Sequence, residues 1–231
     1  MKKVFFLLII MLAACSVKQE KTIETKQEFP IKAEHNSCSA FTDDILNLAK
    51  QDPYFFFVVD KKHHLPADYT PQDLIGKGKF AVREQTSKAF NKMAAEAKKD
   101  GINLFILSGF RPYTRQEYLF NRSVKTKGLD HAEKYVARPG ASQHQLGTAI
   151  DIDSVEDSFV NTKEYAWLQK NACKYGFSLS FPKGQEEKTG YMFESWHYRY
   201  ITPDGCRIQK EHFNDSQVDF LDALQLCLKQ N

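Results

Sequence analysis

A histidine and two aspartates lie close together in the sequence, within residues 142–153. His144 precedes Asp151 by seven residues, and a glycine-containing turn separates the histidine from the apolar stretch that carries the aspartate. An imidazole nitrogen and a carboxylate oxygen placed in this way can bind one metal ion at about 2.0 to 2.2 Å. Because side chains alternate along a strand, Asp151 and Asp153 would share one face, so on this pattern either aspartate could be the ligand.

A second imidazole lies further along the chain, again beside a carboxylate. Glu194 precedes His197 by three residues, in the sequence Glu-Ser-Trp-His. Two histidines and one acidic residue around a zinc ion leave a fourth tetrahedral position for water. A glutamate that does not bind the metal can take a proton from that water. The residue types therefore indicate metal-assisted hydrolysis.

A candidate anion-binding arginine lies in the segment 108–113, directly after an apolar stretch. Arg111 follows Gly109 and Phe110 there and precedes Pro112. An arginine on such a loop can hold an anion or stabilise a developing oxyanion. Each of the three segments is a weak signal alone, since a histidine beside an aspartate often has a structural role and an arginine often lies on the surface.

Taken together, the three segments resemble the zinc D-alanyl-D-alanine carboxypeptidases of the vancomycin-resistance (VanY-like) type and their L,D-carboxypeptidase relatives. The family pattern is Ser-x-His-x6-Asp followed by Glu-x-x-His, and the chain has Ser142, His144, Asp151, Glu194 and His197 in this order and spacing. The arginine segment, extended to residues 108–116, resembles the segment that holds the family's catalytic arginine. One further segment, 59–74, resembles the family's approach segment. The resemblance covers about residues 55–201.

The resemblance implies a zinc site with a catalytic glutamate. His144, Asp151 and His197 would bind Zn²⁺, which selects Asp151 over Asp153 as the acidic ligand. Asp153 would then be a supporting or turn residue. Glu194 would act as the general base that activates the water bound to zinc. These roles agree with the chemistry inferred from the residue types.

The resemblance also implies residues that hold the substrate. Arg111 would stabilise the tetrahedral oxyanion or orient the substrate. Ser142 would help to bind the terminal carboxylate of the peptide. Tyr113 and Gln116, in the arginine segment, are further candidate substrate-binding residues.

Helical and extended patterns alternate from residue 41 onward, with few βαβ units. Apolar periodicity and β-branched or aromatic content predict helices at 42–51, 87–99, 114–127, 162–175 and 216–229, and strands at 54–59, 102–107, 148–153, 177–181 and 191–201. This order favours an α+β fold with a small, mostly antiparallel sheet flanked by helices. The resemblance implies the zinc peptidase fold of the hedgehog and DD-peptidase type.

The N-terminal residues have the layout of a secretory signal peptide, because Lys2 and Lys3 precede an apolar run that ends in small residues. The run of residues 4–12 spans about 14 Å as a helix, too short for a bilayer core of roughly 30 Å. The sequence Leu-Ala-Ala-Cys at 12–15 resembles the lipobox of bacterial lipoproteins, which implies cleavage before Cys15 and lipidation of that cysteine.

The chain is therefore expected to have three parts. Residues 16–40 are polar and lack a sustained apolar period, as is typical of a flexible tether. We expect a signal peptide at 1–14, the lipidated cysteine with its tether at 15–40, and the zinc carboxypeptidase domain at 41–231.

Cysteine content and charge narrow the function classes. Four cysteines remain besides Cys15, an even number that fits an oxidising compartment and is compatible with two disulfides of unspecified pairing: Cys38, Cys173, Cys206 and Cys227. Without Lys2 and Lys3, 30 basic residues face 29 acidic ones, so nucleic-acid binding is not expected. The neighbouring His63 and His64 are expected at the surface or at a pocket rim, because adjacent residues do not easily share one metal.

We therefore predict an exported, lipid-anchored zinc carboxypeptidase of the bacterial cell envelope, in the periplasm or on the outer surface of a membrane. Its substrate would be the stem peptide of peptidoglycan, from which it would remove a terminal D-alanine. The protein would be a monomer. The sequence does not decide between D,D and L,D specificity. Two alternatives stay open, namely an endopeptidase on the same scaffold and a non-catalytic, zinc-containing protein that binds the cell wall.

Overall fold

The computed structural model describes residues 37–230, so the predicted signal peptide, Cys15 and most of the predicted tether lie outside the described residues. The central sheet consists of β3 (Ile106–Ser108), β4 (Ala149–Ile152), β5 (Phe177–Leu179) and β6 (His197–Tyr200). Its strand order is β3-β4-β6-β5, and every neighbouring pair is antiparallel. A second, two-stranded antiparallel sheet pairs β1 (Leu74–Ile75) with β2 (Val82–Arg83).

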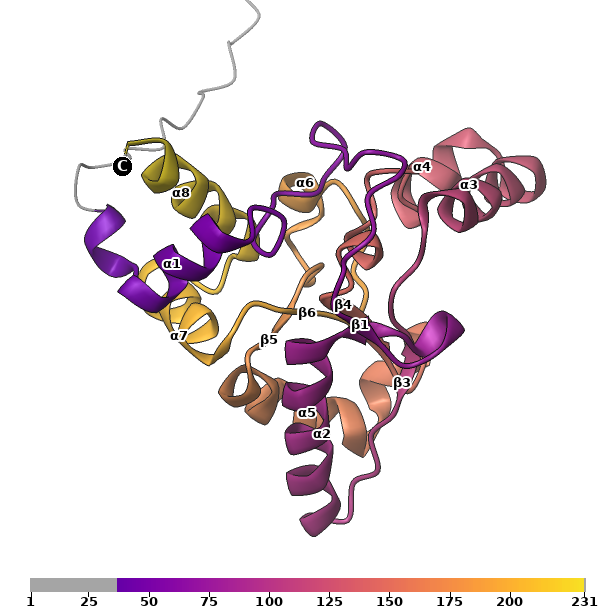
Figure 1. Cartoon of the computed structure of the whole chain (residues 1–231). Coiled ribbons are helices and arrows are strands. Elements are labelled where there is room, and N and C mark those ends of the chain that lie inside the picture. The colour runs from indigo at the N-terminus through magenta and orange to yellow at the C-terminus, as the bar shows by residue number, and fades with distance from the viewer. Residues whose placement is uncertain (1–36, 231) are drawn as a thin grey trace, which may run out of the picture. The chain divides into compact units, whose positions relative to one another are not determined.

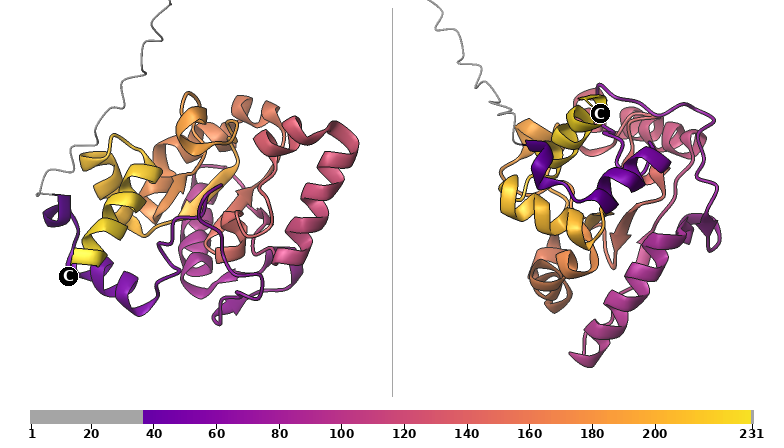
Figure 2. Two further views of the ribbon diagram at one scale, coloured as in Figure 1. Left: turned by 90° about the horizontal axis from the view of Figure 1, so that it is seen from above. Right: turned by 60° about the vertical axis from the view of Figure 1, so that its left-hand side comes forward.

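Helices flank the central sheet. The α-helices are α1 (Asp43–Gln51), α2 (Glu84–Lys99), α3 (Tyr113–Lys127), α4 (Leu129–Tyr135), α5 (Lys163–Asn171), α6 (Glu186–Thr189), α7 (Pro203–His212) and α8 (Gln217–Gln230). The 3-10 helices are η1 (Ser37–Ala40), η2 (Gly78–Phe80), η3 (Gln143–Leu146), η4 (Asp157–Asn161) and η5 (Ala172–Tyr175). α1, α7 and α8 lie together at one side of the sheet, and α3 and α4 lie at the other (Figures 1 and 2). The predicted α+β fold is confirmed. Within residues 37–230, no helix is long and apolar enough to cross a membrane.

Helix caps and apolar faces explain where the first long helices form. The hydroxyl of Thr42 accepts a hydrogen bond from the backbone N–H of Ile45, which gives one of the unpaired donors at the start of α1 a partner. On α2, Phe90, Met93 and Ala97 recur at intervals of three and four residues and are all buried. These are the patterns from which both helices were predicted.

The strand predicted at 54–59 is wrong. Phe55 and Phe56 are adjacent in the sequence, yet both are buried, at 1% and 0% exposure. A buried strand was expected here, but residues 54–59 pair with no strand of either sheet, and a turn buries both rings instead. The backbone N–H of Phe55 donates to the carbonyl of Asp52 in such a turn. The buried guanidinium of Arg199 then donates to the carbonyl of Phe55, over 3.0 Å.

Other predicted elements are present with different bounds. The helix predicted at 114–127 corresponds to α3, but α4 follows it directly and was not predicted. Gly128 separates the two helices with a φ of 86°, a conformation that glycine adopts at little cost. The helix predicted at 162–175 corresponds to α5 followed by η5. The strand predicted over 191–201 is regular only in β6.

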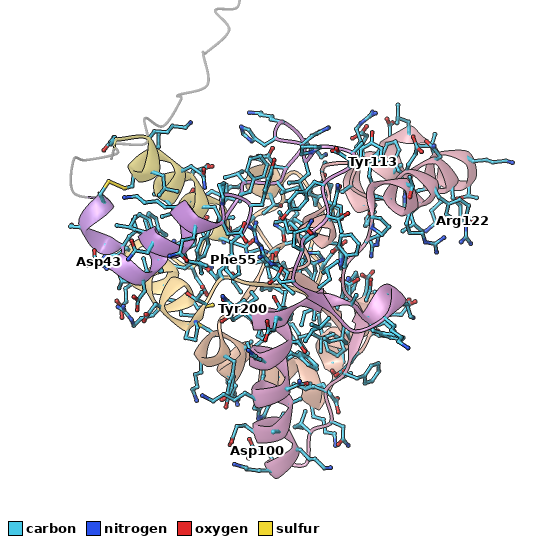
Figure 3. All side chains as sticks on the ribbon, viewed as in Figure 1. Asp43, Phe55, Asp100, Tyr113, Arg122 and Tyr200 are labelled. Atoms are coloured by element: carbon cyan, nitrogen blue, oxygen red, sulfur yellow. A yellow bond between two sulfur atoms is a disulfide. The ribbon has the colours of Figure 1, made fainter. Side chains whose placement is uncertain are left out.

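One disulfide joins the two ends of the described chain. It links Cys38 in η1 to Cys227 in α8, across a sequence separation of 189 residues (Figure 3). η1 is therefore part of the folded domain, which extends at least four residues before the predicted boundary at residue 41. Cys173 and Cys206 are free thiols, so the structure contains only one of the two disulfides that the sequence allows.

Removing this disulfide should lower stability without changing the fold. In the chain-entropy treatment, a cross-link that closes a loop of this length lowers the entropy of the unfolded chain enough to stabilise the fold by about 5 kcal/mol. The double variant Cys38→Ser/Cys227→Ser should lose about this much free energy of unfolding in urea. The parent protein under reducing conditions is the matched control. Equal midpoints for the oxidised parent and the variant would contradict the prediction.

Candidate active site

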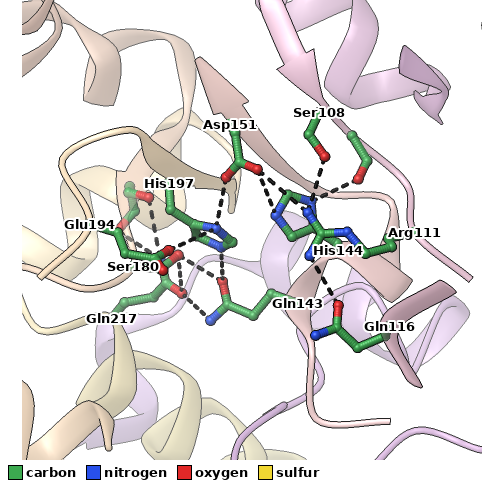
Figure 4. A network of polar contacts seen from close by, with 12 residues as sticks. Ser108, Arg111, Gln116, Gln143, His144, Asp151, Ser180, Glu194, His197 and Gln217 are labelled. Atoms are coloured by element: carbon green, nitrogen blue, oxygen red, sulfur yellow. Dashed lines mark hydrogen bonds and ion pairs between the residues drawn. The ribbon is translucent and has the colours of Figure 1, made fainter. Parts of the chain in front are cut away.

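The pairing of β4 with β6 places Asp151 directly opposite His197. Residues that face each other on neighbouring antiparallel strands point to the same side of the sheet, with their Cβ atoms about 4.5 to 5.5 Å apart. The Oδ1 atom of Asp151 lies 3.2 Å from Nδ1 of His197 (Figure 4). Strand pairing therefore brings together two side chains that are 46 residues apart in the sequence.

His144 reaches the same point from η3, the turn before β4. Its Nδ1 atom lies 2.7 Å from the carbonyl oxygen of Gly109. Since a carbonyl only accepts, Nδ1 carries the proton and Nε2 is left with a free lone pair. Gly147 ends η3 with a φ of 69°, and a Cβ atom there would lie only 2.9 Å from the side chain of Arg83. This turn, which aims His144 at the sheet, therefore requires glycine.

The three donors fit a zinc ion. Nε2 of His144 lies 3.2 Å from Oδ2 of Asp151, and one donor atom from each of His144, Asp151 and His197 falls within a group no wider than 4.8 Å. Ligands at about 2.0 to 2.1 Å from a tetrahedral zinc are roughly 3.3 Å apart. Two imidazoles and a carboxylate are also the donor types that zinc takes in catalytic sites. The three predicted ligands thus converge as a zinc site requires.

Burial and neighbouring side chains give these donors the protonation states that metal binding requires. Burial, together with the nearby Arg111, lowers the pKa of His144 to about 4, so its ring is neutral at pH 7. Burial alone would raise the pKa of Asp151, but the contact with His144 and His197 lowers it well below its usual range. A neutral imidazole and an ionised carboxylate are both ready to bind a cation.

Glu194 lies beside the donors without being one of them. Its Oε2 atom is 3.6 Å from Nδ1 of His197, and its side chain is 19% exposed. Burial raises the pKa of Glu194 to about 7. A carboxylate whose pKa lies close to the working pH can both accept and release a proton, as a general base requires.

Arg111 lies on the other side of Asp151. Its Nη2 atom is 3.6 Å from Oδ2 of Asp151 and donates to the hydroxyl of Ser108. Its Nη1 atom donates to Oε1 of Gln116 over 3.0 Å, and Gln116 in turn donates to the carbonyl of Ala137. The guanidinium is therefore held in one orientation next to the donors.

The donors, Glu194 and Arg111 line one cavity of about 810 Å³. Aromatic side chains form part of its wall, among them Phe181, Tyr191 and Trp196. A pocket of this size that combines apolar walls with a few convergent polar groups is typical of a site for a small ligand or a peptide end.

The remaining predicted substrate-binding residues differ in their positions. Ser142 is 5% exposed and lines the cavity. Gln116 also lines it, but it is only 1% exposed and both ends of its amide are engaged, so it supports Arg111. Tyr113, at the start of α3, is half-buried close to Gly140 and does not line this cavity. The structure thus favours Ser142 over Tyr113 as a residue that a substrate could reach.

The adjacent histidines His63 and His64 are not part of the site. The ring of His63 lies 3.0 Å from a carboxylate oxygen of Asp60, and its side chain is 56% exposed. Neither His63 nor His64 lines the cavity described above. The expected surface position is confirmed.

Asp153 is a turn residue. β4 ends at Ile152, and the backbone of Asp153 turns away with a φ of 61°, so its side chain does not continue the face that carries Asp151. Its Oδ1 atom accepts a hydrogen bond from the backbone N–H of Phe105 over 2.7 Å. Burial raises the pKa of Asp153 to about 6.

This raised pKa predicts that Asp153→Asn stabilises the protein at neutral pH. Because the folded state holds the proton more tightly than the unfolded state, stability falls as the pH rises from about 4 to 6. Asparagine keeps the acceptor and tolerates the positive φ without ionising. The side chain is partly exposed, so we expect a gain of about 1 kcal/mol at pH 8 and almost none at pH 4. Urea unfolding of parent and variant at both pH values measures this, and an equal gain at both would contradict it.

The sequence did not single out three polar residues that complete the site. Gln143, Ser180 and Gln217 are all buried, and they form hydrogen bonds behind His197 (Figure 4). Gln143 stands next to a predicted ligand, which is the one signal in the sequence that pointed to it. Ser180 and Gln217 lie in different elements and carry no motif.

These features define the class of a metal-dependent hydrolase: a buried His-Asp-His donor set, a carboxylate beside it and a fixed arginine. The family model for VanY, D-alanyl-D-alanine carboxypeptidase, matches residues 79–203. The chain is 32% identical over 215 residues to the protein YodJ of Bacillus subtilis, an alignment that covers 84% of this chain and 79% of YodJ. The chain belongs to the VanY D-alanyl-D-alanine carboxypeptidase family.

Solved structures agree with this membership. The LD-carboxypeptidase LdcB matches with a TM-score of 0.68 and 33% identity, over 74% of this chain and 88% of LdcB. A D,D-pentapeptidase VanY from a VanB-type vancomycin-resistance cassette, solved in complex with Zn(II), matches with a TM-score of 0.63 and 26% identity, over 73% of this chain and 99% of that one. The predicted family, fold and zinc cofactor are confirmed.

Proposed function

We propose that this protein is a zinc-dependent carboxypeptidase that removes the C-terminal D-alanine from peptidoglycan stem peptides in the cell envelope. The observation that carries the proposal is the convergence of His144, Asp151 and His197 in one cavity with Glu194 and Arg111. Membership of the VanY family supports the substrate class. The chain is similar to both D,D- and L,D-acting relatives. The residue before the scissile bond of the substrate can therefore have either the D or the L configuration.

The roles of the residues follow from their positions. Zinc held by the three donors supplies Lewis acidity, which polarises a carbonyl group and lowers the pKa of water to about 7. Glu194 takes the proton of the attacking water on its carboxylate. It then gives a proton to the amine of the departing D-alanine, as a group with a pKa near 7 can. Bond cleavage thus returns Glu194 to its ionised state.

Arg111 stabilises the negative charge that develops on the oxygen of the scissile carbonyl. Its hydrogen bonds to Ser108 and Gln116 fix the guanidinium before the substrate arrives, so no reorganisation is needed during the reaction. Ser142, which lines the same cavity, would donate to the terminal carboxylate of the peptide.

The decisive test is incubation of purified protein with tetrapeptide and pentapeptide muropeptides, with and without a chelator. We expect loss of one alanine, detected by mass spectrometry, and no loss in chelator. Loss from the pentapeptide indicates D,D activity, and loss from the tetrapeptide indicates L,D activity. Glu194→Gln should keep its zinc and lose turnover by at least about 10³-fold, because it lacks the base.

Two outcomes would contradict the proposal. Release of fragments larger than one alanine would make the protein an endopeptidase. Binding of muropeptides without cleavage, by protein that contains zinc, would make it a non-catalytic cell-wall-binding protein.

We further propose that the protein is an exported lipoprotein with a signal peptide at 1–14 and a lipid on Cys15. The proposal rests on the sequence alone: a basic start, an apolar run and the Leu-Ala-Ala-Cys pattern. A tether of polar residues would let the domain reach substrate away from the membrane surface.

Substitution of Cys15 should release the protein from membranes. In cells fed a labelled fatty acid, the parent should carry the label and sediment with membranes, because its acyl chains insert into the bilayer. Cys15→Ser should carry no label, and Cys173→Ser is the matched control that should keep it. Label retained by Cys15→Ser would rule out lipidation at this residue.

A further inference from the structure

A chain of buried amides connects the donor His197 to helix α8. Nε2 of His197 lies 3.2 Å from Oε1 of Gln143. Nε2 of Gln143 donates to Oε1 of Gln217 over 3.2 Å, and Nε2 of Gln217 donates to the hydroxyl and the carbonyl oxygen of Ser178. The side chains of Gln143, Ser180 and Gln217, with that of His197, are seen together in Figure 4. We call Gln143 and Gln217 the amide relay.

The hydrogen bonds of the amide relay can run in only one direction, from donor to acceptor. The carbonyl oxygen of Ser178 can only accept, so Gln217 turns its NH2 group to it and its oxygen towards Gln143. Gln143 must then present its own NH2 group to Gln217 and its oxygen to His197. The hydroxyl of Ser180 donates to that same oxygen over 2.7 Å, and this contact is compatible with the assignment. His197 therefore has to donate from Nε2.

This direction decides which nitrogen of His197 is free. A neutral imidazole with its proton on Nε2 has its lone pair on Nδ1. Nδ1 is the atom that faces Oδ1 of Asp151, at 3.2 Å, and so lies on the side of the other donors. The ring of His144 is set in the opposite sense, since its Nδ1 donates to Gly109 and its Nε2 faces Asp151.

The relay also joins separate parts of the chain. Gln143 is adjacent to the donor His144, and both lie in η3. Gln217 is the first residue of α8 and lies beyond residue 203, where the match to the family model ends. α8 carries Cys227, whose disulfide to Cys38 fixes the helix to the start of the domain.

We propose that the amide relay of Gln143 and Gln217 fixes the orientation and tautomer of His197 towards zinc, so that α8 completes the metal site from outside the family-matched region. Gln143 and Gln217 are positioning residues. The inference rests on His197 as a zinc ligand, which is part of the proposed function. Outer hydrogen-bond partners of metal-bound histidines contribute typically 10- to 100-fold to metal affinity.

The test measures zinc affinity of the full-length protein in detergent by competition with a chelator. Gln143→Met keeps the size of the side chain but removes the acceptor, so zinc should bind 10- to 100-fold more weakly. Gln217→Met acts one hydrogen bond further away, and we expect a loss of about 3- to 10-fold. Gln225→Met is the matched control on the same helix. Gln225 donates to the carbonyl of Phe56, outside the relay, and its loss should change zinc affinity less than about twofold.

A conservative variant separates positioning from packing. Gln143→Glu keeps an oxygen for His197, so it should bind zinc at least about fivefold more tightly than Gln143→Met. In ¹⁵N spectra of the zinc-loaded parent, Nε2 of His197 should carry a slowly exchanging proton, and in Gln143→Met that proton should exchange faster.

Each outcome decides the inference. Zinc affinity of Gln143→Met within twofold of the parent would overturn it, as would equal losses in Gln143→Met and Gln143→Glu. If Gln143→Met does not fold, Gln217→Met decides, and an affinity equal to that of Gln225→Met would overturn the role of α8. A parent protein that binds zinc tightly but hydrolyses no muropeptide would refute the proposed function and leave the relay standing.

Discussion

The site depends on the register between β4 and β6, which sets Asp151 against His197. A slip of one residue would turn one of these side chains to the opposite face of the sheet and would separate the two donors. The register is held from both sides, since β3 pairs with β4 and β5 pairs with β6. The complete burial of Ile150 and Ile152, which alternate with Asp151 along β4, adds an energetic cost to any slip.

This arrangement allows charged and polar groups to be buried without being left unpaired. Asp151 is nearly inaccessible, but two imidazoles and Arg111 face it. His144 and His197 each have a second partner behind them, a backbone carbonyl for one and an amide oxygen for the other. A buried carboxylate with such neighbours stays ionised. The cluster is therefore preorganised for a cation before any substrate enters the cavity.

Much of this site could be predicted because the spacing of the motif residues can be recognised in one sequence without an alignment. His144, Asp151, Glu194 and His197 belong to two short segments whose spacing carries the family pattern, and Gly147 marks the turn between His144 and Asp151. Side-chain alternation alone left Asp153 as an equal candidate, since it does not reveal that β4 ends at Ile152. Gln217 could not be found, because its role depends on α8 reaching the back of His197. The strand at 54–59 was wrong because aromatic content does not distinguish a strand from a turn that buries adjacent rings.

The disulfide between Cys38 and Cys227 sets an order of events for the growing chain. Cys227 follows every residue of the site in the sequence. The disulfide can therefore form only after His197 and Gln217 have been synthesised. A polypeptide that ends before Gln217 would therefore lack both the disulfide and the support behind His197.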